Sequence, residues 1–190
     1  MTAPVTTGEA ASSVAVTRPV AVRQVAAGLA TAAALVAASG LGLSLDTVRY
    51  TSGSSDASIT PLAWGPQISG SDISGGFLTV TWGGPLVLAV VLLALAAATA
   101  LVGARTDRGP WAVLAQLLAI AGGALVAGVL GVLVPFGDSD VSTPHHVAGV
   151  TTTWGPVVGA LGVAVALAAG AAVTARRGRP AVLATVQVNR

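Results

Sequence analysis

The sequence predicts an all-α integral membrane protein with four transmembrane helices, arranged as two tandem hairpins in a 2+2 repeat, and a small β-structured outer loop between helices one and two. The first observation behind this prediction is composition: 54% of the 190 residues are hydrophobic and 8% are charged. Soluble domains carry about 25% charged residues, so this chain could hardly furnish a water-facing surface. The second observation is a set of four long uncharged runs, and the third is a short motif that occurs before two of them.

The uncharged runs are long enough to cross a bilayer. Residues 85–104 carry no charge and one polar side chain, Thr99. At 1.5 Å per residue, such a helix covers a hydrocarbon core of ~30 Å. Similar runs predict four spans at about 24–45, 85–104, 111–134 and 156–175. No aspartate, glutamate, lysine, arginine or histidine lies within these expected spans.

A Trp-Gly-Pro motif indicates internal duplication. Trp82-Gly83-Gly84-Pro85 precedes the second run, and Trp154-Gly155-Pro156 opens the fourth. Proline suits the first turn of a helix, where its missing N–H costs nothing. The residues Ala34 to Ala37 also match Ala124 to Ala127. Each half enters and leaves the membrane in the same sense, so the repeats would be related by an axis along the membrane normal.

The remaining segments divide the chain around a membrane domain of residues 18–179. We expect a disordered tail over residues 1–17, outer loops at 46–84 and 135–155, and a second tail over 180–190. In the first outer loop, Ile68, Ile73 and the stretch 77–82 are β-prone pieces between Ser- and Gly-rich turns. An alternative is a secretory signal peptide with a basic n-region, an apolar stretch over residues 25–36 and a cleavage-like site at Val36-Ala37-Ala38, although the repeat favours a retained helix.

The distribution of arginine predicts orientation. All nine basic residues are arginine, and in a four-pass arrangement only Arg49 lies on the outer side. The positive-inside rule therefore predicts a multi-pass protein of the cell membrane with both termini cytoplasmic. The arginines are few and flank apolar runs, so we interpret them as topology signals; the partner they indicate is the lipid bilayer and not nucleic acid.

Several classes of function find no support in the residues. The chain has no cysteine, which excludes disulfides, thiol catalysis and thiolate metal sites. It has no nucleophile-base-acid set, phosphate-binding glycine loop or cofactor motif, so we predict no enzymatic activity, catalytic residue or cofactor. Ion-coupled carriers and voltage sensors need ionisable groups within the membrane, and the expected spans contain none.

A few residues remain as candidates for function. His145 and His146, with Asp138 and Asp140, could bind Zn²⁺ or Cu²⁺ on the outer face, assisted by an aspartate of the longer loop; the alternative is an ordinary solvated loop. Gln116 could line a path or form an interhelical hydrogen bond. We expect Trp82, Trp111 and Trp154 to anchor the helices at the membrane interfaces.

Small residues recur at a spacing of four and predict close helix packing. The pairs are Gly28 with Ala32, Ala127 with Gly131 and Gly155 with Gly159, and a separate run with the same spacing is formed by Gly162, Ala166 and Gly170. The leading hypothesis is a non-catalytic accessory subunit, assembly factor or scaffold that contacts a membrane-protein partner or itself. The alternatives are a facilitator or carrier for an uncharged or lipidic solute, and an outer-face metal or pH sensor.

Overall fold

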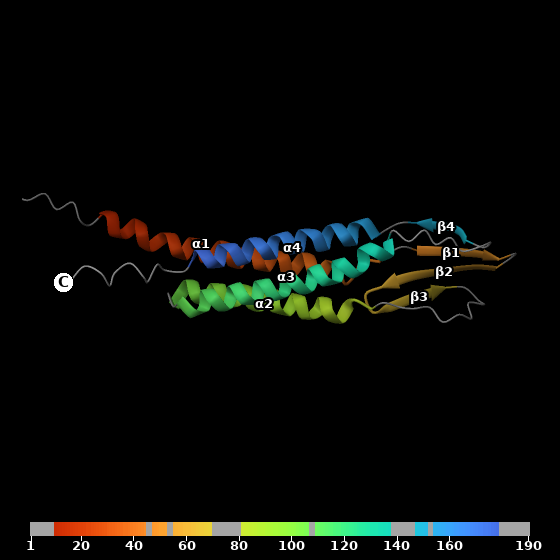
Figure 1. Ribbon diagram of the computed structural model, residues 1–190, viewed down its shortest axis with the longest axis horizontal. Helices are drawn as coiled ribbons and strands as arrows, with labels where there is room; N and C mark the ends of the chain where they lie inside the picture. Colours follow the sequence, from red (N-terminus) through yellow and green to blue (C-terminus); the bar gives the residue numbers. More distant parts are fainter. Residues whose placement is uncertain are drawn as a thin grey trace, which may run out of the picture.

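Four long helices form one bundle, and a small sheet extends beyond one end of it (Figure 1). The structure is a computed structural model that describes residues 10–44, 47–52, 55–69, 81–106, 109–137, 147–151 and 154–178. Within these segments, side chains are described for residues 20–44, 58–69, 81–106, 109–133 and 156–178. The helices are α1 (Ala10–Ser39), α2 (Gly83–Thr106), α3 (Gly109–Gly137) and α4 (Trp154–Arg177).

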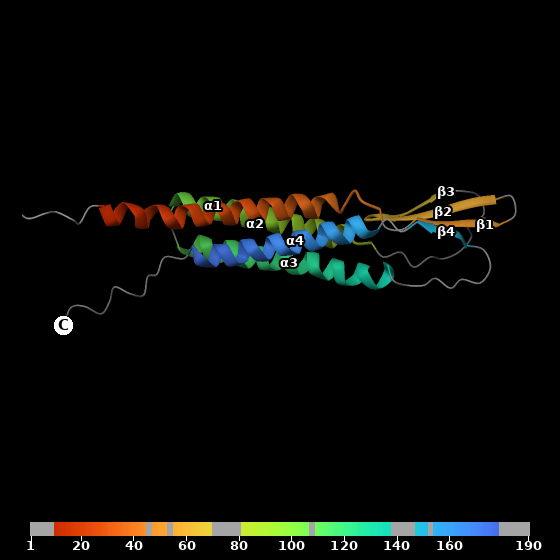
Figure 2. The same cartoon turned by 90° about the horizontal axis from the view of Figure 1, so that it is seen from above.

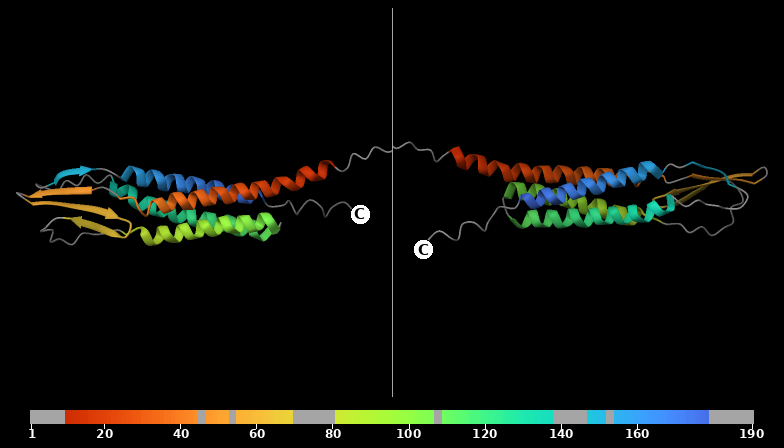
Figure 3. Two further views of the ribbon diagram at one scale, coloured as in Figure 1. Left: turned by 180° about the vertical axis from the view of Figure 1, so that it is seen from behind. Right: turned by 45° about the horizontal axis from the view of Figure 1, so that its top comes forward.

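The helices follow one another around a closed ring. α1 packs against α2 and α4, α3 packs against the same two helices, and α1 barely touches α3 across the ring. α1 and α3 run toward the sheet, whereas α2 and α4 run away from it (Figures 1 and 3). Each helix contains a segment long and apolar enough to cross a membrane: Val20–Ser39, Gly83–Thr106, Gly109–Leu133 and Pro156–Arg177. The prediction of a mostly helical protein with four such segments is confirmed.

The first helix differs most from expectation. It begins at Ala10, inside the segment 1–17 predicted to be disordered, and it ends at Ser39 instead of residue 45. Its N-terminal part extends beyond the other helices (Figure 1). The segment that could cross a membrane starts at Val20 and contains Arg23, so the expectation that no ionisable residue lies within the spans is wrong for α1. The segments of α2 and α4 also contain arginines, but only in their last two residues.

The sheet combines strands from both predicted outer loops. β1 (Thr47–Ser52), β2 (Ser55–Leu62) and β3 (Gly65–Ser69) come from the first loop, and β4 (Val147–Thr151) comes from the second. Their order is β3-β2-β1-β4, and all neighbours are antiparallel. Figure 2 shows this sheet as a thin layer beyond the helix ends. The β-structured first loop is thus confirmed, but the sequence indicated no strand in the second loop.

The strand registers explain how the two loops meet. Val48 pairs with Ile59 of β2 on one side and with Val150 of β4 on the other, so β1 is the strand that joins them. Of the predicted β-prone pieces, Ile68 lies in β3, Ile73 falls outside the described residues, and residues 81–82 lead into α2 without forming a strand. The connection that unites the loops is therefore long-range and leaves no local signal in the sequence.

The buried core changes in side-chain size along the bundle axis. Near the sheet, a cluster that we call the sheet-end core contains Trp82 and larger aliphatic residues: Leu86, Leu93, Val126, Val129, Leu133, Val157 and Leu161. Toward the opposite end, which we call the Arg23 end, the buried hydrophobic residues are all alanine: Ala26, Ala27, Ala30, Ala96, Ala97, Ala100, Ala112, Ala115, Ala119, Ala171, Ala172 and Ala175. Helix backbones approach most closely where the side chains between them are smallest.

Candidate functional site

Arg23 is the one buried charged residue among the described side chains, with 1% of its surface exposed. Its Nε and Nη2 donate hydrogen bonds to the carbonyl oxygen of Gly178, at 3.3 and 3.2 Å. Its Nη1 donates to the carbonyl oxygen of Gly103. One guanidinium group on α1 therefore binds the C-terminal ends of both α2 and α4.

The last turn of a helix is a suitable acceptor for this cation. The final four carbonyl groups of a helix lack partners within it, and they carry the negative end of the helix dipole. Gly103 lies within the last four residues of α2, and Gly178 directly follows α4. A charge buried in a membrane bundle is costly unless it is paired or bonded to carbonyl groups, and Arg23 has this compensation.

Glycine at these two positions permits the close approach. A Cβ atom at Gly103 would lie 2.9 Å from Cβ of Trp111, and one at Gly178 would lie 3.1 Å from Cγ of Arg23. The Gly103 contact also brings the start of α3 against α2. Arg23 thus joins α1 to the ends of α2 and α4, and the contact of Gly103 with Trp111 adds α3.

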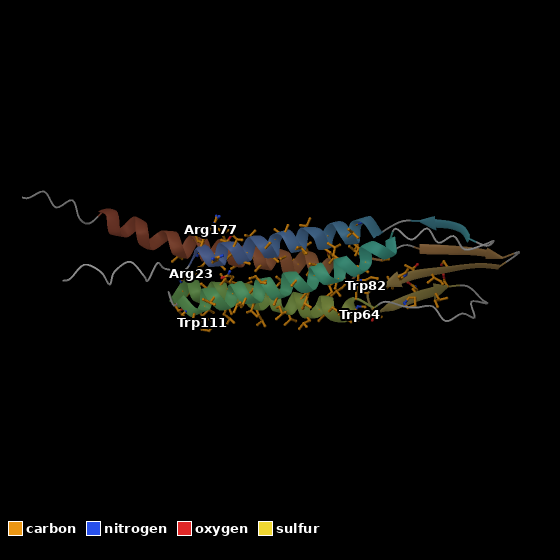
Figure 4. All side chains as sticks on the ribbon, in the orientation of Figure 1. Arg23, Trp64, Trp82, Trp111 and Arg177 are labelled. Carbon is orange, nitrogen blue, oxygen red and sulfur yellow. The ribbon has the colours of Figure 1, made fainter. Side chains whose placement is uncertain are left out.

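Three further arginines lie around the buried one. Arg105 is in the last turn of α2, and Arg176 and Arg177 are in the last turn of α4. All three are exposed, and the described side chains include no aspartate or glutamate that could pair with them. Figure 4 shows Arg23, Arg177 and Trp111 at the same end of the bundle. This group of arginines is the most strongly charged region in the described part of the chain.

The opposite end of the bundle contacts the sheet through a tight junction. The N–H of Gly83, at the start of α2, donates a 2.8 Å hydrogen bond to the carbonyl of Ala63 in the β2–β3 turn. A Cβ at Gly83 would lie 2.8 Å from the Trp64 ring, so only glycine allows this contact. Gly65 completes the turn with φ of 141°, a conformation that side chains rarely adopt. Ala63 is fully buried and extends the sheet-end core into the turn.

Trp82 lies within this junction and not on the membrane-facing surface. It is 3% exposed and packs in the sheet-end core, whereas an interface anchor would expose its ring to headgroups. Its Nε1 is buried without a hydrogen-bond partner. Trp64 lies at the same end of the bundle (Figure 4). It is 65% exposed, which is the exposure expected of a membrane-interface anchor.

The other predicted site residues are not brought together in the described structure. Gln116 is partly buried on α3 and has an interaction partner. Trp111 is partly buried near the start of α3, and the side chain of Trp154 lies outside the described residues. The metal-site candidates Asp138, Asp140, His145 and His146 also lie outside them, so the metal hypothesis stays a prediction. In the segments that are described, no cluster could hold a metal ion.

The predicted small-residue pattern does not form the helix contacts. Gly28, Gly131, Gly159 and Gly162 have no atom of another helix within 4 Å of a Cβ position, and only Gly170 meets a neighbour, Leu29. Contacts form instead where Gly122 meets Leu93 and where Gly123 meets Ala168. Spacing identifies a face of small residues, but the rotation of each helix decides whether that face points inward.

Sequence reasoning missed Arg23 as a structural centre because it treated every arginine as a flanking charge. A local signal was present, since Val20-Ala21-Val22 precedes Arg23 and Val25-Ala26-Ala27 follows Gln24. An arginine with apolar residues on both sides is already within the helix. Comparison with known proteins finds no matching family model, no similar curated protein and no similar solved structure.

Proposed function

We propose that this chain is a non-catalytic membrane scaffold or accessory subunit, which presents its sheet to a partner membrane protein. The observation that carries the proposal is the joining of residues 47–69 with β4 in one four-stranded sheet. Each of the four helices is connected in sequence to a strand of this sheet. The position of the sheet therefore depends on the whole bundle, which holds it in one place for a partner to bind.

Exposed apolar side chains on the sheet support a role in recognition. Trp64 lies in the β2–β3 turn, and Ile68, 49% exposed, lies on the edge strand β3. Large aromatic and aliphatic groups of this kind supply much of the binding energy at protein interfaces. Among the described strands, β3 has a neighbour on one side only, so an extended partner segment could pair with its other side.

The packing of the bundle supports a scaffold over a carrier. The axis is filled by alanine at the Arg23 end and by leucine and valine near the sheet. Polar groups that could line a path are few in the described spans, and Arg23 already uses its donors on two carbonyls. The carrier alternative predicts that Gln116→Leu abolishes solute flux, and the sensor alternative predicts Zn²⁺ or Cu²⁺ binding that requires His145 and His146.

We also propose that the bundle arose by duplication of a helical hairpin, in a cell membrane with both termini cytoplasmic. The closed ring supports the duplication, because α1 and α3 occupy equivalent positions between the same two neighbours. The exposed arginines at the ends of α2 and α4 support the orientation through the positive-inside rule.

The experiment is purification of the tagged chain from its native membranes in mild detergent, with mass spectrometry of co-eluting proteins. We expect a partner at near-equal amount. Ile68→Ala should reduce its recovery by about tenfold, an effect common for an apolar contact residue. Leu88→Ala is the matched control, since Leu88 is 52% exposed but lies on the outer face of α2.

Each result has a distinct meaning for the proposal. Loss of the partner with Ile68→Ala alone supports docking through the sheet. Loss of the partner with Leu88→Ala alone would show that the partner binds the outer face of α2, and it would overturn the proposal that the sheet is the docking surface. Elution of the wild-type chain as a monomer without any partner overturns the accessory role.

A further inference from the structure

We propose that the Arg23 end of the bundle is a binding site for the phosphate group of an anionic phospholipid. The site consists of exposed Arg105 on α2 and exposed Arg176 and Arg177 on α4. Its ligand is a lipid headgroup with a net negative charge, such as that of phosphatidylglycerol. This inference is independent of the partner proposed for the sheet.

The first step is that Arg23 joins the C-terminal ends of two helices that carry exposed arginines. Its guanidinium binds both the Gly103 and Gly178 carbonyls, so the ends of α2 and α4 lie within reach of one side chain. Arg105 is two residues from Gly103, and Arg177 is adjacent to Gly178. The exposed cations of α2 and α4 therefore belong to the same end of the bundle, although the two helices are separated by other helices around the ring.

The second step is that the protein does not neutralise these charges within its described part. No aspartate or glutamate occurs in the segments whose side chains are described, and the three exposed arginines have no partner there. The helix C-terminal carbonyls could partly offset them, but Arg23 occupies the Gly103 and Gly178 carbonyls and adds a fourth positive charge. An anion at this position would relieve the mutual repulsion.

The third step is depth in the membrane. Arg105 and Arg177 lie in the last two residues of the segments that could cross the bilayer, Gly83–Thr106 and Pro156–Arg177. Trp111, a residue type common at the interface, lies at the same end (Figure 4). The guanidinium groups are thus at the level of the lipid phosphates, and their planar fork matches phosphate geometry. Basic residues near the membrane surface attract anionic headgroups, with about 1 kcal/mol for each arginine or lysine.

The test uses the full chain in lipid nanodiscs and measures the relative association of labelled phosphatidylglycerol and phosphatidylcholine. We expect phosphatidylglycerol to be preferred, with each arginine contributing up to about fivefold at low salt. Arg177→Gln should lower the preference, and the triple change Arg105→Gln, Arg176→Gln and Arg177→Gln should reduce it to about onefold. Arg49→Gln, on β1 beyond the opposite end, removes the same charge and should leave the preference unchanged.

Two controls make the outcome decisive. Because the three side chains are exposed and solvent screens their repulsion, the triple variant should melt in phosphatidylcholine at the wild-type temperature or slightly above it. Inorganic phosphate at millimolar concentration should not displace the labelled lipid; displacement would assign the site to a free anion and overturn the lipid proposal. Equal association of the two lipids with the wild type, or an undiminished preference in the triple variant, would also overturn it.

Discussion

At the Arg23 end, alanine side chains fill the space between the helices, and the buried guanidinium of Arg23 joins α1, α2 and α4. At the sheet end, leucine, valine and Trp82 fill the core, and the packing continues into the β2–β3 turn through Ala63. The first region depends on small size and on a charge with carbonyl partners. The second depends on the shape of larger side chains. In lipid, where helices gain no hydrophobic drive toward one another, these are two different ways to obtain close packing.

The comparison predicts opposite sensitivities at the two ends. The sheet end should suffer when a side chain is made smaller, because a cavity remains. The Arg23 end should lose stability when a buried side chain is enlarged, or when the buried guanidinium of Arg23 is removed. Reversible unfolding in mild detergent, followed by tryptophan fluorescence or circular dichroism, measures each effect.

The largest expected effect follows Arg23→Leu. The substitution leaves the Gly103 and Gly178 carbonyls without their charged donor, and it should lower the free energy of unfolding by roughly 3 kcal/mol. Arg23→Lys should lose about half as much, because an ammonium group lacks the fork that reaches both carbonyls. Arg105→Gln, an exposed position, is the control. Unchanged stability in Arg23→Leu would remove the basis for treating this end as a distinct region.

Truncation in the sheet-end core comes next. Leu161 is fully buried, and Leu161→Ala should cost about 2 kcal/mol, mainly through lost van der Waals contacts around a cavity. Leu88→Ala removes the same atoms from the outer face of α2 and should change stability by less than about 0.5 kcal/mol. Equal costs for the two variants would mean that the core at this end is not closely packed.

Enlargement at the Arg23 end tests the other half of the comparison. Ala115 is buried among other alanines, so Ala115→Leu should overpack the core and cost about 1–2 kcal/mol. Ala124 lies on the exposed face of the same helix, and Ala124→Leu should be nearly neutral. If Ala115→Leu were tolerated as well as the control, the alanine layer would have free volume.

The smallest effect is expected for Trp82→Phe. Nε1 of Trp82 is buried without an acceptor, so removing this donor relieves an unfavourable burial, whereas the smaller phenyl ring leaves a cavity in the sheet-end core. The two contributions should nearly cancel and change the free energy of unfolding by less than about 1 kcal/mol, and fluorescence from the other tryptophans reports the folded state. A loss of about 2 kcal/mol, as expected for Leu161→Ala, would indicate that the packing of the indole ring outweighs its unpaired donor.

Much of the fold follows from local patterns, but the candidate sites do not. The uncharged runs predict all four helices because a bilayer requires about twenty apolar residues, whatever the neighbours are. Ile68 was placed in a β-prone piece, and it lies in β3. The sequence predicts Trp82 at the membrane surface, but the β2–β3 turn packs against the start of α2 and the ring is buried in the sheet-end core. The apolar residues on both sides of Arg23 indicate that it lies within a helix, but its partners, the carbonyls of residues 103 and 178, are distant in the sequence and leave no local signal.

By itself, the amino-acid sequence determined that this chain forms four long apolar helices with arginine near their ends, because hydrophobicity, length and charge act within a single segment. Only the tertiary structure decided that Arg23 is buried, that β4 joins β1, and that Gly122 faces a neighbour while Gly131 does not. These properties depend on the rotation of each helix and on contacts between segments up to 155 residues apart. Such contacts form only when all four helices have packed together.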